Sequence, residues 1–408
     1  MNPAMRDRLR AALSQPARRE PVAAPRAVTE LPDLSGLGGR WFESPHGPGY
    51  VIESLYDAGH AHGRVPLHRA LALDTSALAT QCRDDRLAAI DPAALLYVDT
   101  ETTGLGGAGA MVFLAGVARF DGSVLRLRQY LLPSPRYEGG LLGGLAGDVS
   151  RAAALVSYNG KSFDVPVLEA RYTLSRMRPA IRDLPHLDLL HPNRRLFKGA
   201  LDSHRLTHIE QELLAFERED DCPSWEVPER YFAFQRSGDP THIAPVLRHN
   251  AWDVLSLVAL AAHLADICSG QAYPLQAARA AEYAGDWAAA VDRYATALSG
   301  TLSRPARLEA MERAARAHAR LGDWPGAARW WQALIDEPRT RRLLPYVELA
   351  KILEHRTRDL PAALAVVDEA LALVERGLVR PGLAGSPLGA DALRHRRARL
   401  LRRLGSPA

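Results

Sequence analysis

The sequence predicts an α/β domain with a five-stranded mixed sheet, followed by an all-α domain of helical repeats. Residues 91–268 contain five apolar runs of strand length, and a helical stretch separates the fourth run from the fifth. From about residue 275 the strand patterns disappear, and alanine-rich helical patterns return with a spacing of 36 to 37 residues. We therefore expect a sheet domain over 91–268 and a repeat domain over 275–408.

Length and composition bound the class of protein. The chain has 408 residues, enough for two to three domains at ~150 residues each. Its 47% hydrophobic and 24% charged residues fall in the globular range, so wholesale disorder is excluded. No uninterrupted apolar run approaches the ~18 residues of a membrane-spanning helix, and we expect no membrane partner.

Cysteine usage and the N-terminal residues favour a reducing compartment. Cys82, Cys222 and Cys268 lie far apart, which argues against a disulfide scaffold and a zinc ribbon. The N-terminal segment has arginines but lacks the apolar region of a secretory signal, so we expect a cytoplasmic protein. The pI of about 9.0 leaves nucleic acid open as a partner, but a net charge of only +4 does not establish it.

The first 90 residues precede the predicted sheet domain. Residues 1–35 are rich in Pro, Ala and Arg without periodicity, and we expect a disordered basic arm. Residues 36–90 contain short apolar stretches broken by Gly and Pro, which predict a small β-containing extension. A metal site at His60 and His62 would need further ligands nearby, and we find none in the sequence, so the pair is interpreted as part of a turn.

The predicted strands of the sheet domain follow in order along the chain. The first three are the runs LLYVDTE, MVFLAGVARF and VLRLRQYLL, and short loops join them, so they must be antiparallel neighbours. The run ALVSY, a helix from about Phe163 to Arg176 and the run HLDLL come next. This order implies two parallel strands joined by a right-handed crossover. Residues 200–219 and 242–266 are predicted as helices.

The C-terminal third contains an internal repeat. One aspartate marks the same position in each copy: Asp286, Asp323 and Asp359. The period resembles that of tetratricopeptide repeats, which stack helix pairs into a concave surface for a protein partner. The tryptophans of this region are expected to pack between helices: Trp287, Trp324, Trp330 and Trp331. The arginine-rich segment DALRHRRARLLRRL is interpreted as a capping helix, with a phosphate contact as the alternative.

Four acidic residues carry the predicted chemistry. Asp99 and Glu101 end the first strand and point to the same side, because residues two apart on a strand share a face. Asp164 stands where the fourth strand becomes a helix, and Asp253 lies on a helix with an apolar face. Acids beside apolar surface need a partner, which a divalent cation provides. Oxygen ligands suit hard cations, so we expect Mg²⁺ or Mn²⁺, as two ions ~3.5–4 Å apart.

The motifs around these acids resemble those of the DEDD exonucleases, which have the ribonuclease H-like fold. VDTETTGL is similar to their first motif, NGKSFD to their second and HNAWDVLSL to their third. The stretch from about residue 40 to 268 is also similar to bacterial proteins of the YprB type, in which tetratricopeptide repeats often follow a ribonuclease H-like domain. The resemblance implies that Asp99, Glu101, Asp164 and Asp253 are metal ligands.

The same resemblance implies that His249 is the general base. Its four-residue step to Asp253 is the spacing of the tyrosine-type members of the superfamily, here with a histidine. Residues i and i+4 of a helix share a face, so both side chains can point at the site. Histidine suits proton removal from water at neutral pH. A structural histidine on the helix surface stays an alternative.

Other polar residues near these motifs have different interpretations. Asn159 either positions the second-motif aspartate or a phosphate, or it caps the helix that follows. The Gly-Lys-Ser segment at 160–162 lacks the first glycine of a P-loop, which argues against an NTPase. Lys161 is interpreted as a solvated loop residue, with a contact to a nucleic-acid phosphate as the alternative. Asp188 is expected to have a structural role beside the site, and Asp220 and Asp221 are expected in a solvated loop.

Together these features predict a metal-dependent nuclease. The resemblance favours a 3′–5′ exonuclease that binds a single-stranded 3′ end of DNA or RNA and hydrolyses phosphodiester bonds with two metal ions. Two alternatives stay open. One is a nucleic-acid or protein-binding adaptor with a weak or silent nuclease site. The other is a ribonuclease H-type endonuclease, which uses similar carboxylates.

Overall fold

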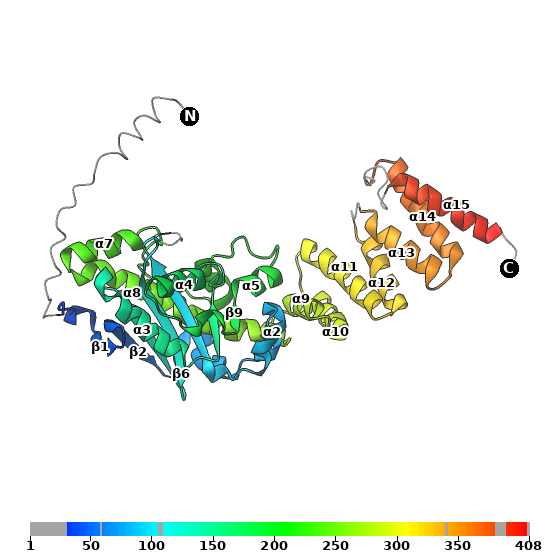
Figure 1. Ribbon diagram of the computed structural model, residues 1–408. Coiled ribbons are helices and arrows are strands. Elements are labelled where there is room, and N and C mark those ends of the chain that lie inside the picture. The colour runs from blue at the N-terminus through cyan, green and yellow to red at the C-terminus, as the bar shows by residue number, and fades with distance from the viewer. Residues whose placement is uncertain (1–30, 58, 105–108, 339–341, 380–388, 406–408) are drawn as a thin grey trace, which may run out of the picture.

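The structure of the protein, a computed structural model, describes residues 31–57, 59–104, 109–338, 342–379 and 389–405. The expected basic arm lies almost entirely outside these residues. Figure 1 shows an α/β domain, with helices around one sheet, and a helical array that extends away from this domain toward the C-terminus.

The sheet has seven strands in the order β1-β2-β7-β6-β5-β8-β9. Their bounds are β1 Arg40–Ser44, β2 Gly47–Tyr56, β5 Leu95–Thr102, β6 Val112–Asp121, β7 Val124–Leu131, β8 Ala154–Ser157 and β9 His186–Asp188. All five predicted strands are present. As expected, β5, β6 and β7 are antiparallel neighbours, and β8 is parallel to both β5 and β9.

The prediction of only five strands is wrong, because β1 and β2 join the same sheet. They form a hairpin, and β2 pairs antiparallel with β7 from Tyr50 to Tyr56. Glycines interrupt the apolar pattern that would have signalled β2. Gly49 is required where it stands, because a Cβ at this position would lie 2.5 Å from the Phe42 ring.

A second sheet of two short strands follows β2 in the chain. It pairs β3 (Ala61–His62) with β4 (Val65–Pro66). His62 is buried and its Nε2 lies 2.7 Å from Ser256 Oγ, while its ring packs on Phe216. The expectation of a turn was incomplete, since His62 lies in a strand, but its partners are a hydroxyl and an aromatic ring rather than metal ligands.

Helices cover both faces of the large sheet. Their bounds are α2 Thr75–Cys82, α3 Glu138–Val149, α4 Asp164–Leu174, α5 Leu190–Leu196, α6 Leu206–Ile209, α7 Val227–Ser237 and α8 Pro240–Cys268. Short 3₁₀ turns link them: η1 Ser35–Leu37, η2 Leu67–Ala72, η3 Asp85–Ala89, η4 Pro92–Ala94, η5 Pro135–Tyr137 and η6 Ala180–Arg182. Alternate residues of β5 enter two cores, with Tyr97 facing α2, α5 and the second half of α8, and Val98 facing α3, α4 and α7.

Helix α8 is the central helix of this domain. By length and composition it could cross a membrane. However, 83% of its most apolar 18-residue segment is buried inside the protein, as in the core helix of a soluble domain. The predicted helix over 242–266 is therefore confirmed. The one over 200–219 is only partly right, since α6 is short and continues into a π-helical turn, η7 (Glu210–Leu214). Helix α7 was not predicted.

The described C-terminal residues form helices only. Their bounds are α9 Pro274–Ala284, α10 Trp287–Ser299, α11 Arg304–Arg320, α12 Trp324–Asp336, α13 Leu344–His355, α14 Leu360–Glu375 and α15 Ala390–Gly405. Asp286, Asp323 and Asp359 are the N-caps of α10, α12 and α14, and each side chain accepts a hydrogen bond from the backbone N–H three residues on. Helical repeats are thus present, and their likeness to tetratricopeptide repeats stays a prediction.

Side-chain packing within the array agrees with the sequence. All four tryptophans of this region are buried or partly buried in one cluster between helices, as expected. At the far end, the buried carboxylate of Glu354 on α13 bonds three arginines of α15: Arg396 at 2.6 Å, Arg399 at 2.7 Å and Arg403 at 3.2 Å. The arginine-rich C-terminal segment is therefore a capping helix, with three of its cations partnered inside the array.

At the near end, α9 fixes the array to the α/β domain. Arg279 Nη1 donates to the backbone carbonyl oxygens of Leu196 at 2.6 Å and Lys198 at 3.1 Å. In the other direction, Gln81 Nε2 on α2 donates to the carbonyl oxygen of Ala280 at 3.0 Å. Buried hydrogen bonds of this kind cost free energy to break, so they stabilise the contact between the first repeat and the domain.

Candidate active site

Strand β5, an interior strand of the sheet, carries Asp99 and Glu101 near its C-terminal end, on the face covered by α8. A register shift between Glu101 and Thr102 ends regular pairing with β6 immediately after the two acids. Asp99 Oδ2 accepts a hydrogen bond of 2.8 Å from Asn250 Nδ2 on α8. Asn250 can approach because β6 has Gly116 beside it, where a Cβ would lie 2.2 Å from Asn250 Oδ1.

Asp164 is the first residue of α4, the helix that follows β8, and its side chain contacts the neighbouring strand β5. Its Oδ1 accepts hydrogen bonds from Thr100 N at 3.0 Å and Thr100 Oγ1 at 2.6 Å. The loop before it is fixed by Asp188, whose carboxylate accepts the backbone N–H groups of Asn159 at 2.8 Å and Lys161 at 3.1 Å. The structural role expected for Asp188 is therefore observed. Asn159 lines the cavity and does not cap α4.

Helix α8 supplies His249 and Asp253 one turn apart. His249 Nε2 lies 3.3 Å from Asp253 Oδ2 and 3.9 Å from Glu101 Oε1. One ligand atom from each of the three residues falls within 4.8 Å of the others, a spacing that one metal ion can bridge. The structure thus brings together all the residues that the motifs predicted, from β5, α4 and α8.

A buried arginine that sequence reasoning missed lies behind these acids. Arg218, only 5% exposed, donates through Nη2 to Asp253 Oδ1 at 2.5 Å. The same guanidinium makes a two-pronged bond to Glu210 on η7, at 2.6 and 2.7 Å. Glu210 also accepts a hydrogen bond of 2.5 Å from Ser256 Oγ. Arg218 therefore fixes one oxygen of Asp253 and leaves the other free to face the site.

The expectation that Asp221 belongs to a solvated loop is wrong. Its Oδ1 lies 2.7 Å from His249 Nδ1, and its Oδ2 accepts a hydrogen bond of 3.2 Å from Arg218. The sequence shows Asp221 only as part of the charged run EREDD at 217–221. Its position beside α8 becomes visible only in the folded chain. Its neighbour Asp220 is exposed, in agreement with the prediction.

The electrostatics of the cluster show why it suits a cation. Burial raises the pKa of Asp99 and of Glu101 well above the usual range, and repulsion from Asp253 raises both further. Burial also raises the pKa of Asp164 to about 6, although the hydrogen bonds from Thr100 oppose that shift. Carboxylates that repel one another at close range favour a divalent cation, and oxygen ligands fit Mg²⁺ or Mn²⁺.

A cavity of about 480 Å³ opens over the acid cluster. On one side it is lined by the partly buried rings of Tyr158 and Phe163. Arg194 and Arg205 line it as well; both are exposed, and among the residues that the structure describes no carboxylate lies within ion-pair distance of either. An open cavity with acids at its base and unpaired guanidinium groups at its rim suits a polyanionic ligand.

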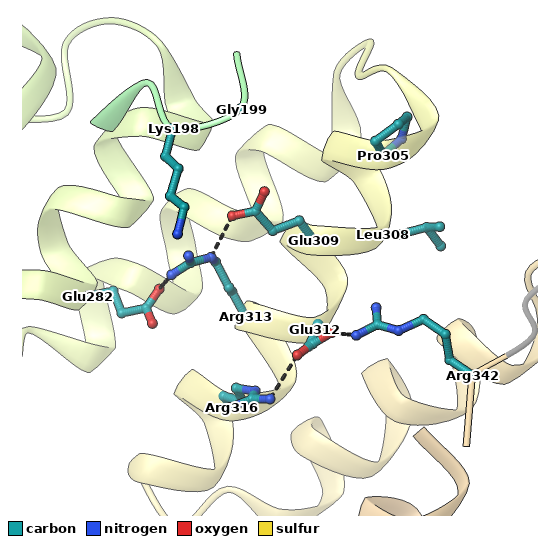
Figure 2. A pocket seen from close by; sticks show the side chains of 10 residues that line it. All are labelled: Lys198, Gly199, Glu282, Pro305, Leu308, Glu309, Glu312, Arg313, Arg316 and Arg342. Atoms are coloured by element: carbon teal, nitrogen blue, oxygen red, sulfur yellow. Dashed lines mark hydrogen bonds and ion pairs between the residues drawn. The ribbon is translucent and has the colours of Figure 1, made fainter. Parts of the chain in front are cut away.

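A larger hollow of about 680 Å³ lies where the loop after α5 meets the helical array, and Figure 2 shows its lining. Its acidic side chains each bond an arginine within 3 Å: Glu282 and Glu309 bond Arg313, and Glu312 bonds Arg316 and Arg342. Because these charges neutralise one another, the junction hollow lacks the clustered carboxylates that a divalent cation requires.

The mixed sheet and the converging acids define a ribonuclease H-like domain. The chain belongs to the RNase H superfamily, whose sequence profile matches residues 96–265. It is also 34% identical over 289 residues to the uncharacterised protein YprB of Bacillus subtilis (strain 168), a match that covers 68% of this chain and 69% of that protein. The predicted resemblance to ribonuclease H-like proteins of the YprB type is therefore confirmed.

Proposed function

We propose that the protein is a metal-dependent 3′–5′ exonuclease that acts on a single-stranded 3′ end. The observation that carries this proposal is the convergence of Asp99, Glu101, Asp164 and Asp253 with His249 in one open cavity. Membership of the RNase H superfamily supports hydrolysis of a nucleic acid. The polarity and the two-ion mechanism rest on the resemblance of the motifs to DEDD exonucleases.

The four carboxylates would hold two ions of Mg²⁺ or Mn²⁺. A divalent cation bound there supplies positive charge that offsets the negative charge developing on the phosphodiester oxygens. Asp99 and Asp164 each keep one oxygen oriented by a hydrogen bond, from Asn250 and Thr100. Such fixed ligands need little reorganisation when a substrate binds.

His249 would accept the proton of the attacking water. We assign the ring proton of His249 to Nδ1, which then donates to Asp221 Oδ1 at 2.7 Å. Arg218 Nη1 also lies 3.2 Å from Nδ1, and in this assignment it donates to Asp221 Oδ2 instead. That assignment leaves the lone pair on Nε2, which faces Asp253 and Glu101 across the cavity. In many hydrolases the general base is oriented by a hydrogen bond to another side chain, as His249 is by Asp221.

The rim of the cavity would hold the strand. Arg194 and Arg205 offer planar guanidinium groups to successive phosphates, and such contacts recognise any sequence. The three cysteines are all free, and a reducing, cytoplasmic location is part of the proposal. The helical array would offer a surface for a protein partner.

A degradation assay tests the proposal. Single-stranded DNA, duplex DNA and RNA, each labelled at the 5′ end, are incubated with Mg²⁺ and with Mn²⁺, alongside the Asp99→Asn variant and the surface control Asp292→Asn. We expect a ladder of shortened labelled products with the wild type and the control only. Cleavage of a circular substrate would point instead to an endonuclease. Absence of cleavage by folded protein would favour the adaptor.

A further inference from the structure

An exposed tryptophan, Trp225, directly follows a residue that lines the cavity over the acid cluster. Trp225 is 76% exposed, the highest value among the exposed large hydrophobic side chains of the described residues. The residue before it, Ser224, lines the cavity that holds the acid cluster. Tryptophan carries one of the largest apolar surfaces of any side chain, so a ligand that covers this indole would gain a large contact area.

The segment that carries Trp225 is anchored on both sides. Cys222 and Val227 are buried in the core, and the backbone N–H of Glu226 donates to the carbonyl oxygen of Pro223 at 2.8 Å, which closes a turn. Upstream, Asp221 is bonded to the catalytic histidine. The indole is therefore presented from a fixed turn.

The reach from the site is short. Trp225 is four positions after Asp221 in the chain, and four extended residues span at most about 14 Å. Asp221 is itself in contact with His249. The indole thus lies close enough to the acid cluster to meet the part of a polymer that extends directly out of the cavity.

We propose that Trp225 stacks on a base of the single-stranded substrate as the strand enters the cavity. This inference rests on the proposed nuclease function and names the contact that would hold the base. Every nucleobase has a flat π face, so stacking on an indole tolerates any sequence. The rim arginines, Arg194 and Arg205, would hold the phosphates on either side, and the two kinds of contact together fit a single strand better than a duplex, whose bases are already stacked.

A nucleobase suits this position better than a protein partner. The exposed side chains that line the cavity are polar or charged: Arg194, Arg205, Thr207 and Ser224. The apolar lining, which includes Tyr158, Phe163 and Leu206, is partly buried. Protein interfaces instead bury contiguous apolar patches around such an anchor. An exposed aromatic ring beside cationic and hydroxyl groups is the composition of a single-strand binding groove.

Abasic substrates test the proposal directly. Binding of 5′-fluorescent single-stranded DNA is measured by anisotropy in Ca²⁺, with one abasic nucleotide moved stepwise from the 3′ end. For the wild type, we expect affinity to fall by about 5- to 150-fold at one or two positions, the equivalent of ~1–3 kcal/mol of stacking. Trp225→Ala should bind the intact strand as weakly as the wild type binds the abasic strand, and its affinity should no longer depend on where the abasic nucleotide lies. Trp225→Phe should keep the positional dependence of the wild type.

Controls separate the possible failures. Leu174→Ala, which removes another exposed apolar side chain, should bind and discriminate like the wild type. Thermal unfolding should be unchanged for Trp225→Ala, because its side chain is exposed. If Trp225→Ala keeps the wild-type abasic profile while hydrolysis proceeds, the stacking contact is refuted and the nuclease function stands. If the wild type neither binds nor cleaves any strand, the proposed function itself fails.

Discussion

Asp221 Oδ1 lies 2.7 Å from His249 Nδ1, although 28 residues of chain separate them. The imidazole is held with Nε2 toward Asp253 and Glu101, and the proposed function assigns the ring proton to Nδ1. Orientation of an imidazole by a carboxylate is how many hydrolases prepare a base for proton transfer.

Asp221→Asn therefore tests the role of His249. The amide can donate to Nδ1 and so place the imidazole proton on Nε2, where it blocks proton acceptance. We expect kcat to fall by ~10²–10⁴-fold with little change in KM. The measurement is steady-state hydrolysis of a 5′-labelled strand, with Asp220→Asn as the neighbouring exposed control. Unchanged kcat would assign His249 a structural role.

Arg218 should be needed for activity because it positions the carboxylate of Asp253. Arg218→Met leaves the carboxylates of Glu210 and Asp253 without their cation, and we expect a loss of ~3–5 kcal/mol in the free energy of unfolding. The double variant Arg218→Met/Glu210→Gln also removes the unpaired buried charge of Glu210. It should therefore recover part of the stability, but not the activity. Chemical denaturation and the degradation assay separate the two effects. Full activity in the double variant would contradict the positioning role.

Asp164→Asn should stabilise the metal-free protein while abolishing its response to metal. The amide oxygen can still accept both hydrogen bonds from Thr100, but one of four repelling charges is gone. We expect a gain of ~1–3 kcal/mol without metal. With the wild type, Mn²⁺ at ~100 times its Kd should add about 2.7 kcal/mol, reversed by EDTA. A thermal scan with and without Mn²⁺ measures both, and an equal Mn²⁺ shift in the variant would remove Asp164 from the ligand set.

A buried histidine far from the acids predicts a loss of stability in acid. Burial lowers the pKa of His263 to about 4, with Arg64 and Arg69 adding to the shift. The unfolded chain therefore binds a proton near pH 6.5 that the folded chain takes only near pH 4, so stability falls as pH drops through this window. His263 Nε2 has no hydrogen-bond partner among the described atoms, which makes removal inexpensive.

His263→Leu should remove that pH dependence. Relative to the wild type, we expect the variant to be more stable at pH 4.5 by up to ~3 kcal/mol, with a smaller difference at pH 7.5. The comparison uses denaturant midpoints of the two proteins at both pH values, so that the other titrating groups cancel. Parallel pH profiles would contradict the assignment.

The C-terminal helix should depend on one carboxylate. Glu354→Gln removes the charge that holds Arg396, Arg399 and Arg403, and α15 should become accessible to protease and to amide exchange. Activity on a short strand should persist, because the change lies at the far end of the array. The exposed Glu375→Gln is the matched control. Wild-type exchange protection of α15 in Glu354→Gln would contradict this prediction.

Local signals explain what the sequence could predict. Each predicted strand of the central sheet is a continuous apolar run, and Asp286, Asp323 and Asp359 are caps whose chemistry involves only the next three residues. The motif acids were found because each stands at the end of a strand or on a strongly apolar helix. These features need no knowledge of distant parts of the chain.

Long-range contacts explain what was missed. Strand β2 joins the sheet by pairing with β7, more than 70 residues away, and its glycines mask the alternation that marks a strand. Arg218 reaches Asp253 from 35 residues away in the chain, and a π-helical turn directs Glu210 toward it. No local pattern records which of the chain's many arginines becomes buried.

The recurring caps at Asp286, Asp323 and Asp359 have a consequence for how this chain can change length. Each unit of 36 to 37 residues brings its own start signal, so an in-frame duplication of one unit would fold without rewriting its neighbours. Only the two ends are constrained: α9 must keep its bonds to the α/β domain, and α13 must keep Glu354 for the last helix. Growth or loss of units between those ends would alter the reach of the array and leave the catalytic sheet untouched.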